Sequence, residues 1–349
     1  MTETEKIRLT SYSHGSGCGC KISPEILRKI LIQRDDFPHH PSLVIGNESS
    51  DDAAVLDTGH GPLLISTTDF FMPIVDDPYD FGRIAATNAI SDVYAMGGNP
   101  IVAVAILGWP IEKLGPEIAA QVLEGARFIC RIAGIPLAGG HSIDSPEPIF
   151  GLAVNGLVKK EHLKRNNTAQ ENDLLFITKP IGLGIISTAA KRELATEEDM
   201  ETATRYMCNL NRLGEALGAM QGVHALTDIT GFGLLGHTIE MAEGSGLTAE
   251  IRFDQVPLIP GLDRYLSQMI YPDMTMKNYS AFSSKVNTLN AQQLFVMCDP
   301  QTSGGLLVAV DPASRKEFQE AANDFGVGNI CGNEIGKMIS KGEKVVTCL

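Results

Sequence analysis

The sequence predicts a mixed α/β fold divided between two domains. Its 349 residues exceed a common domain size of ~100–200 residues. Short apolar runs alternate with longer stretches of helical periodicity in both halves. Between the halves, residues 159–172 hold four Lys or Arg and three Asn, which is typical of a connection between domains. We therefore expect a flexible glycine-rich segment over 1–22, an N-terminal domain over 23–160 and a C-terminal α/β domain over 161–349.

Helices and strands follow each other closely in the first half. Ser23, Pro24 and Glu25 form a helix-start signal, and that helix is expected to run to about Gln33. The other predicted elements are a hairpin of 53–56 and 62–66, a helix over 80–96 ended by two glycines, a strand over 101–109, a helix over 116–133 and a strand over 149–158.

The second half repeats this mixture. Strands are predicted over 174–178, 225–228, 247–253, 294–297 and 306–310, and helices around 183–193, 197–219, 234–243 and 313–325. A short β ending follows. We find neither a short sequence repeat nor a low-complexity tract.

Composition and charge exclude several classes of protein. A hydrophobic share of 44% and a charged share of 20% are those of a globular chain, which at this length can bury a core without disulfides or structural metals. A net charge of −14 argues against nucleic-acid binding and implies that a polyphosphate would need Mg²⁺ to enter an acidic site. Seven cysteines, the lack of a span of ~18 apolar residues and a polar start predict a cytoplasmic protein without a membrane segment.

Aspartates at the ends of predicted elements are the most informative chemical feature. Asp51 and Asp52 precede a strand, Asp69 ends one, and Asp228 ends another. Asp92 lies on a mostly apolar helix, four residues after Asn88 and so on the same face. Carboxylates held by rigid elements are suited to bind Mg²⁺, which typically bridges one or two carboxylates to phosphates. Each aspartate taken alone is more simply a turn former or a helix cap.

A second group lies in the glycine-rich segment, where Cys18 and Cys20 precede Lys21. A thiol near a lysine can have a lowered pKa and act as a nucleophile, and a mobile loop could close it over a substrate. An unstructured tail with two incidental thiols explains the spacing equally well.

Three glycine motifs are weaker. Residues 137–142 read as a strand entering a Gly-Gly turn, whose backbone could approach a phosphate or ribose. Residues 231–236 fit a dinucleotide fingerprint but lack the distant acid, so we expect close helix–strand packing there. Residues 299–305 resemble a phosphate cradle, but a plain turn between two strands is the default interpretation. The sequence has no P-loop and no hydrolase nucleophile elbow.

Six segments together resemble the selenophosphate synthetases (selenide, water dikinases), within the wider aminoimidazole ribonucleotide synthetase-like superfamily. They are 13–21, 46–54, 67–73, 86–92, 138–142 and 226–237. The resemblance runs from about residue 8 to beyond Leu307. It implies a two-domain fold whose N-terminal sheets pair across a homodimer, with ATP in a groove at that interface.

The resemblance also implies an activity and a set of site residues. ATP, selenide and water would give selenophosphate, AMP and phosphate. Cys18 would occupy the position of the family's essential cysteine or selenocysteine. Lys21 would be the essential lysine that contacts the ATP phosphates. Mg²⁺ would be held by Asp52, Asp92 and Asp228, and ATP would contact Ser49, Ser50, Asp51, Asp69, Asp92, Gly140, His141 and Ser142. ATP, selenide and a second copy of the chain are the implied partners, and a selenium-delivery protein is a further candidate.

Two other functions stay open at this stage. Another kinase or synthetase of the superfamily, such as one acting on thiamine monophosphate, would need no thiol at position 18. A non-catalytic selenium or metal carrier would use Cys18 and Cys20 as soft ligands and leave the aspartates structural.

Overall fold

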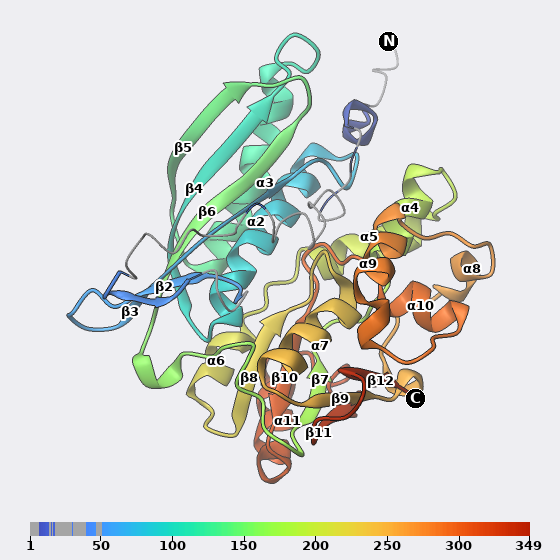
Figure 1. The fold of residues 1–349 in the computed structure, drawn as a ribbon. Helices are drawn as coiled ribbons and strands as arrows, with labels where there is room; N and C mark the ends of the chain where they lie inside the picture. Colours follow the sequence, from blue (N-terminus) through green and yellow to red (C-terminus); the bar gives the residue numbers. More distant parts are fainter. Residues whose placement is uncertain (1–6, 14, 16, 18–29, 31–39, 47–50) are drawn as a thin grey trace.

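The chain builds two six-stranded sheets, one after the other along the sequence (Figure 1). The structure is a computed structural model that describes residues 7–13, 15, 17, 30, 40–46 and 51–349. Apart from Ile30, which is helical, the predicted helix from Ser23 to Gln33 lies outside the described residues, as do the candidate residues Cys18, Lys21, Ser49 and Ser50. No helix in the described part of the chain is long and apolar enough to cross a membrane.

The first sheet has the strand order β1-β2-β3-β6-β4-β5. The predicted hairpin is confirmed, because β2 pairs antiparallel with β3. The strands are β1 (Leu43–Ile45), β2 (Ala54–Leu56), β3 (Leu63–Phe71), β4 (Asn99–Trp109), β5 (Leu137–Asp144) and β6 (Ile149–Val158).

Two long helices cover one face of this sheet. Helix α2 (Pro78–Ala95) begins at Asp77, whose side chain accepts a hydrogen bond from the backbone N–H of Asp80. Helix α3 (Pro116–Ala133) ends at Gly134, where φ is +77° and a left-handed residue closes the helix. Both helices were predicted from the sequence. No described element covers the opposite face of the sheet, and Ile101 and Val104 of β4 are 40% and 38% exposed.

The second sheet has the order β12-β9-β11-β7-β10-β8. Its strands are β7 (Leu174–Ile177), β8 (Val223–Asp228), β9 (Thr248–Ile251), β10 (Leu306–Val310), β11 (Gly336–Ile339) and β12 (Val346–Cys348). Its helices are α4 (Leu183–Lys191), α5 (Glu197–Met207), α6 (Leu213–Ala219), α7 (Gly233–Gly244), α8 (Asp263–Leu266), α9 (Asp273–Phe282), α10 (Ala291–Met297) and α11 (Arg315–Asp324). Short 3-10 turns, among them η1 (Leu9–Tyr12) and η3 (Lys160–His162), link or precede these elements.

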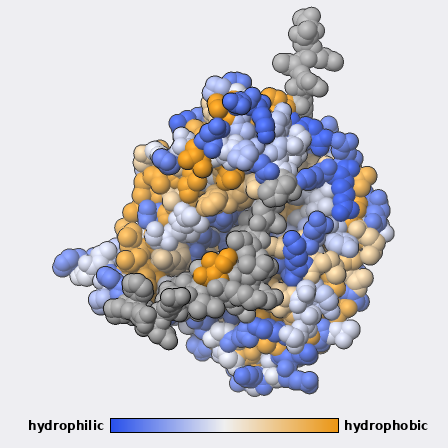
Figure 2. All heavy atoms as spheres, turned by 45° about the horizontal axis from the view of Figure 1, so that its top comes forward, coloured by the Kyte–Doolittle hydropathy of each residue, from blue (hydrophilic) through white to orange (hydrophobic). Residues whose placement is uncertain are grey.

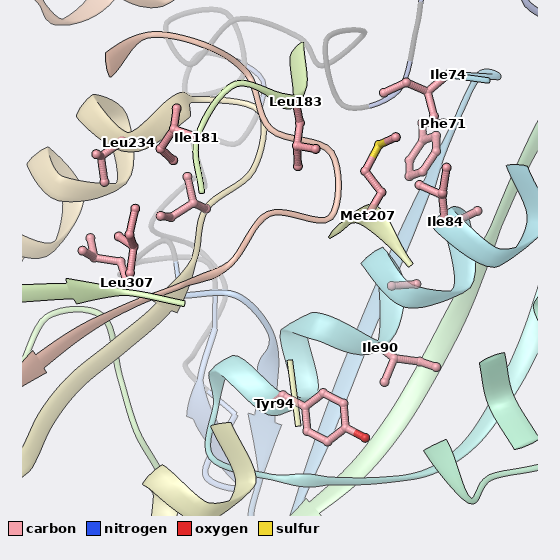
Figure 3. Packing of buried hydrophobic residues seen from close by; sticks show 14 of the residues in the cluster. Phe71, Ile74, Ile84, Ile90, Tyr94, Ile181, Leu183, Met207, Leu234 and Leu307 are labelled. Carbon is pink, nitrogen blue, oxygen red and sulfur yellow. The ribbon is translucent and has the colours of Figure 1, made fainter. Parts of the chain in front are cut away.

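The core continues from the first half of the chain into the second. Figure 3 shows Ile84 of α2 beside Met207 at the end of α5, with Phe71 of β3 next to them. These three side chains belong to one buried apolar cluster. Helix α2 therefore packs on the first sheet and also against the second half, which brings its polar residues to the junction between the two.

Three local predictions were wrong. Residues 294–297 are helical, because Asn290 and Gln293 form a capping box that starts α10. The helix expected over 197–219 is interrupted at 208–212, where the amide of Asn211 bonds Ser91 and the carbonyl of Gly304. The Gly-Gly pair 139–140 is not a turn but continues β5, with φ values of +133° and +152°. A side chain at Gly140 would meet the backbone of Ala105, so the strand passes there only with glycine.

Candidate active site

Helix α2 brings two predicted aspartates together. Asp92 lies on α2 and accepts a hydrogen bond from the hydroxyl of Thr67 on β3. One turn earlier, the amide of Asn88 donates to Oδ2 of Asp69 at 2.6 Å. Since Thr67 and Asp69 are two residues apart on β3, both face the helix. The side chains of Asp69 and Asp92 are thus held at the same contact between strand and helix.

The other two aspartates reach this place from β2 and β8. Asp228, 2% exposed at the end of β8, accepts a hydrogen bond from Ser91 Oγ of α2 at 2.6 Å. Asp52 precedes β2 and accepts one from Thr227 Oγ1 at 2.9 Å. The predicted metal ligands Asp52, Asp92 and Asp228 therefore surround the junction between the two halves of the chain.

The electrostatics of this junction favour a bound cation. Burial, and then the nearby carboxylates of Asp228 and Asp92, raise the pKa of Asp52 well above its usual range. Its Oδ2 atom is buried and has no hydrogen-bond partner among the described residues. An orphaned carboxylate oxygen beside two further carboxylates is the kind of group that a divalent cation satisfies.

The aspartates do not form a complete metal cage on their own. Among the described residues, no three His, Cys, Asp or Glu side chains lie close enough to hold a metal ion between them. Mg²⁺ commonly takes only one or two carboxylates and fills its remaining positions with water and substrate phosphate. The donors therefore fit Mg²⁺ that arrives with a polyphosphate better than a resident structural ion.

Asp51 has a different environment from its neighbour Asp52. Its Oδ1 accepts a hydrogen bond from the backbone N–H of Asn166 at 2.9 Å. Asn166 lies in the connection between the two halves, so Asp51 ties this connection to the edge of the site. Its predicted contact with ATP stays a prediction.

The segment Asp299–Gly305, expected to be a plain turn between strands, is a buried part of this site. It links α10 to β10, and all of its residues are buried. The backbone N–H of Ser303 donates to Asn88 Oδ1 at 2.7 Å, so Asn88 bridges Asp69 and this segment. Ser303 has φ of +53°, a strained conformation for a residue with a side chain. The sequence interpretation of this segment favoured a turn, although its resemblance to a phosphate cradle was noted.

The described residues before Cys18 are anchored at the same junction. Arg8 forms ion pairs with Asp76 and with Glu193, which follows α4. Gly17, the residue that precedes Cys18 in sequence, donates its N–H to the carbonyl of Met72 at 3.1 Å. A side chain at Gly17 would overlap Thr302 of the Asp299–Gly305 segment. Gly17 therefore lies beside the Asp299–Gly305 segment.

Gly140, His141 and Ser142 are not brought to the aspartates within one chain. They lie on β5, the edge strand, with β4 and β6 between them and β3. In register, His141 pairs with Ile106 of β4, which in turn aligns with Gly151 and Phe70 across the sheet. His141 therefore belongs to the open face with Phe70, whereas Asp69 faces α2.

The fingerprint-like glycines allow close packing, although against α9 and the end of α10 rather than against the strand that was expected. A side chain at Gly236 would meet the Cβ of Phe232 and the ring of Phe282, and one at Gly233 would meet the backbone around Asp299. The glycines allow α7 to lie close to these groups.

Comparison with known proteins gives a consistent family assignment. The profile of the AIR synthase related protein N-terminal domain matches residues 50–158, and that of the C-terminal domain matches residues 170–348. A selenide, water dikinase from Pseudomonas putida is 55% identical over 340 residues, which cover 97% of this chain and 97% of the relative. Another, from Aeromonas salmonicida, is 56% identical over 321 residues and covers 92% and 93%.

Solved structures of more distant proteins share the fold. A thiamine-monophosphate kinase from Stenotrophomonas maltophilia matches with a TM-score of 0.64 and 19% identity, covering 93% of this chain and 94% of the kinase. The hydrogenase maturation protein HypE, solved in complex with ATP, matches with a TM-score of 0.61 and 20% identity, covering 87% and 83%. The two domain profiles and the high identity over nearly the full chain together show that the chain belongs to the selenide, water dikinase family of AIR synthase related proteins.

Proposed function

We propose that this enzyme makes selenophosphate from selenide, water and ATP, with AMP and orthophosphate as the other products, and that the aspartate junction is where ATP is bound with Mg²⁺. The relatives that share more than half of its residues are named selenide, water dikinases. The observation that carries the site is the convergence of Asp52, Asp92 and Asp228, with the Asp52 Oδ2 atom left without a partner among the described residues.

The aspartates and the residues that hold them position the nucleotide. Bound Mg²⁺ supplies neutralisation of the triphosphate charge and polarisation of its phosphoryl oxygens. Thr67, Ser91 and Thr227 each donate a hydrogen bond to one of the three proposed ligands and fix its orientation. With ligands fixed in advance, in-line phosphoryl transfer depends mainly on positioning and charge neutralisation.

Cys18 and Lys21 complete the proposal from outside the described residues. Lys21 adds a positive charge to the phosphates, and Cys18 holds or guides selenium as it attacks. Hydroselenide is already ionised at neutral pH, so the enzyme needs to deliver it and exclude water rather than deprotonate it. Support comes from the anchoring of Gly17, which precedes Cys18 and packs beside Thr302.

We further propose that a homodimer completes the nucleotide site. The open face of the first sheet carries exposed apolar side chains on three strands, among them Phe70 (48%), Val104 (38%) and Ile143 (61%). Orange spheres gather on the side of the molecule where this sheet lies (Figure 2). A contiguous apolar face of this kind marks an interface. Pairing through it gives Gly140, His141 and Ser142 a way to contact ATP bound by the other subunit, which they lack within one chain.

The reaction belongs in a reducing compartment, and we place the protein in the cytoplasm for that reason. A selenium-delivery protein that brings the substrate to the Cys18 segment is compatible with this placement.

Phosphorus NMR of a reaction containing the enzyme, ATP, Mg²⁺ and selenide tests the proposal. We expect a phosphorus–selenium species together with AMP and orthophosphate. Formation of ADP with a phosphorylated organic acceptor would instead support another kinase of the superfamily. Absence of any selenide-dependent turnover of ATP would support a carrier.

A further inference from the structure

A cavity of about 540 Å³ lies beside the Asp299–Gly305 segment. Its wall includes Thr178 and Lys179 after β7, the connection 208–213 between α5 and α6, and residues that follow α11. Ser303 separates this cavity from Asn88, because the Ser303 carbonyl accepts from Lys179 Nζ at 2.8 Å while its N–H donates to Asn88.

Lys179 is an unusual residue for a cavity wall. It is only 2% exposed, and its ammonium makes one hydrogen bond, to the Ser303 carbonyl. No carboxylate among the described residues lies within ion-pair distance of it. Burial lowers its pKa to about 7, although the negative charge of the nearby Asp228 acts in the opposite direction. A buried ammonium with a single hydrogen bond is costly, and two of its three protons have no acceptor among the described residues.

Lys164 provides a contrast within the same chain. It is also buried, at 8% exposed, but its ammonium donates to the carbonyls of Met220 and Val223, both at 2.7 Å. Lys164 does not line the cavity. The ammonium of Lys164 is thus held by two protein acceptors, whereas that of Lys179 has one among the described residues, and Lys179 lines the cavity.

The cavity wall is linked to the aspartate junction by two short chains of hydrogen bonds. Lys179 connects through Ser303 and Asn88 to Asp69. The amide of Asn211, also in the wall, donates to Ser91 Oγ, which donates to Asp228. The other charged residues of the wall are Arg212 and Asp324. A ligand held by Lys179 would therefore act on both sides of the nucleotide site.

We infer that this cavity is a binding site for a small inorganic anion, held by the Lys179 ammonium and supported by the amide and hydroxyl groups beside it. The inference rests on the proposed function, since that reaction consumes hydroselenide and releases orthophosphate, two anions of this class. No bond forms or breaks in the cavity; it is a waiting position for an anion on its way into or out of the reaction.

The test measures anion binding to the full-length enzyme without turnover. Orthophosphate, and separately hydrosulfide as the sulfur analogue of the substrate, are titrated in the presence of saturating Mg²⁺ and a non-hydrolysable ATP analogue, and thermal stabilisation and calorimetry are recorded. Lys179→Met removes the charge at similar volume, Lys179→Arg keeps it, and Lys164→Met controls for loss of a buried lysine elsewhere. Lys179→Gln is a second neutral variant if the methionine variant fails to fold.

We expect Lys179→Met or Lys179→Gln to weaken the binding of at least one anion tenfold or more, with Lys179→Arg within a few-fold of the wild type and Lys164→Met unchanged. A raised KM for selenide in the neutral variants would identify the substrate as the natural occupant. Weaker inhibition by orthophosphate with an unchanged KM would identify the product. Equal binding of both anions by wild type and neutral variants, or no binding by the wild type, would overturn the inference. The binding test needs no turnover. Its failure can therefore be distinguished from failure of the proposed reaction, which the phosphorus–selenium signal reports.

Discussion

Replacing Asn88 tests whether α2 really connects the nucleotide site to the second half of the chain. Asn88 is fully buried, accepts from the backbone N–H of Ser303 at 2.7 Å and donates to Asp69 at 2.6 Å. In Asn88→Ala, the Ser303 N–H loses its partner in a buried position, which costs about 1–3 kcal/mol. Alanine's higher helix propensity returns about 0.5 kcal/mol. The expected net loss is about 0.5–2.5 kcal/mol of unfolding free energy.

The same change should weaken nucleotide binding. Ser303 has a strained backbone at φ of +53°, held by Asn88 on one side and Lys179 on the other. Losing one of these supports frees the segment and leaves the Asp69 side chain less well oriented. A loss of about 1.4 kcal/mol in binding corresponds to a tenfold increase in the Kd for Mg-ATP.

Urea unfolding followed by the fluorescence of Trp109 measures the first effect, and calorimetry with a non-hydrolysable ATP analogue measures the second. Trp109 is the single tryptophan and is 4% exposed at the end of β4. Thr87→Val is the matched control, because Thr87 is equally buried on α2 but bonds only the Arg83 carbonyl of its own helix. If Asn88→Ala unfolds within about 0.5 kcal/mol of this control and binds Mg-ATP as tightly, the described connection does not support the site.

Three further predictions concern other parts of the molecule. Cys18→Ser and Lys21→Ala should abolish selenide-dependent product in the phosphorus NMR assay with an unchanged circular dichroism spectrum; normal product from either would reject its proposed role. Burial raises the pKa of Asp299 to about 8, so the folded state keeps a proton that the unfolded chain releases near pH 4. The unfolding free energy of the wild type should therefore fall from about pH 4 to pH 8, and Asp299→Asn should flatten this dependence in urea titrations; parallel curves would contradict the assignment. Ile143→Glu places a charge on the open sheet face and should give monomers in light scattering, whereas a stable dimer would exclude this face as the interface.

Much of the fold could be predicted because local signals agree with it. The glycines that follow α2 and α3 were sufficient to place the ends of these helices. The failures occurred where tertiary contacts decide. The interruption between α5 and α6 places the Asn211 amide on Ser91 and Gly304, contacts that sequence periodicity cannot reveal. Ile101 and Val104 are exposed because they lie on an open face of the sheet. In a single sequence, an apolar strand on such a face looks the same as a buried strand.

The site was predicted in part. The aspartates were found because acids at strand ends and in mid-helix are conspicuous, and the structure brings Asp52, Asp69, Asp92 and Asp228 to one junction. The Asp299–Gly305 segment was noted as resembling a phosphate cradle but was interpreted as a turn, because its sequence is equally typical of one. Its role depends on backbone groups of Ser303, which carry no signal in the sequence beyond the neighbouring glycines. Lys179 was missed for a similar reason, since nothing near it in sequence marks it as buried.

The most direct test of the account is a crystal structure of the full chain with Mg²⁺ and a non-hydrolysable ATP analogue. The account predicts metal ions that bridge the analogue's phosphates to Asp52, Asp92 and Asp228, with the Asp52 Oδ2 atom now coordinated. An analogue seated elsewhere, with these three carboxylates still free of metal, would contradict it.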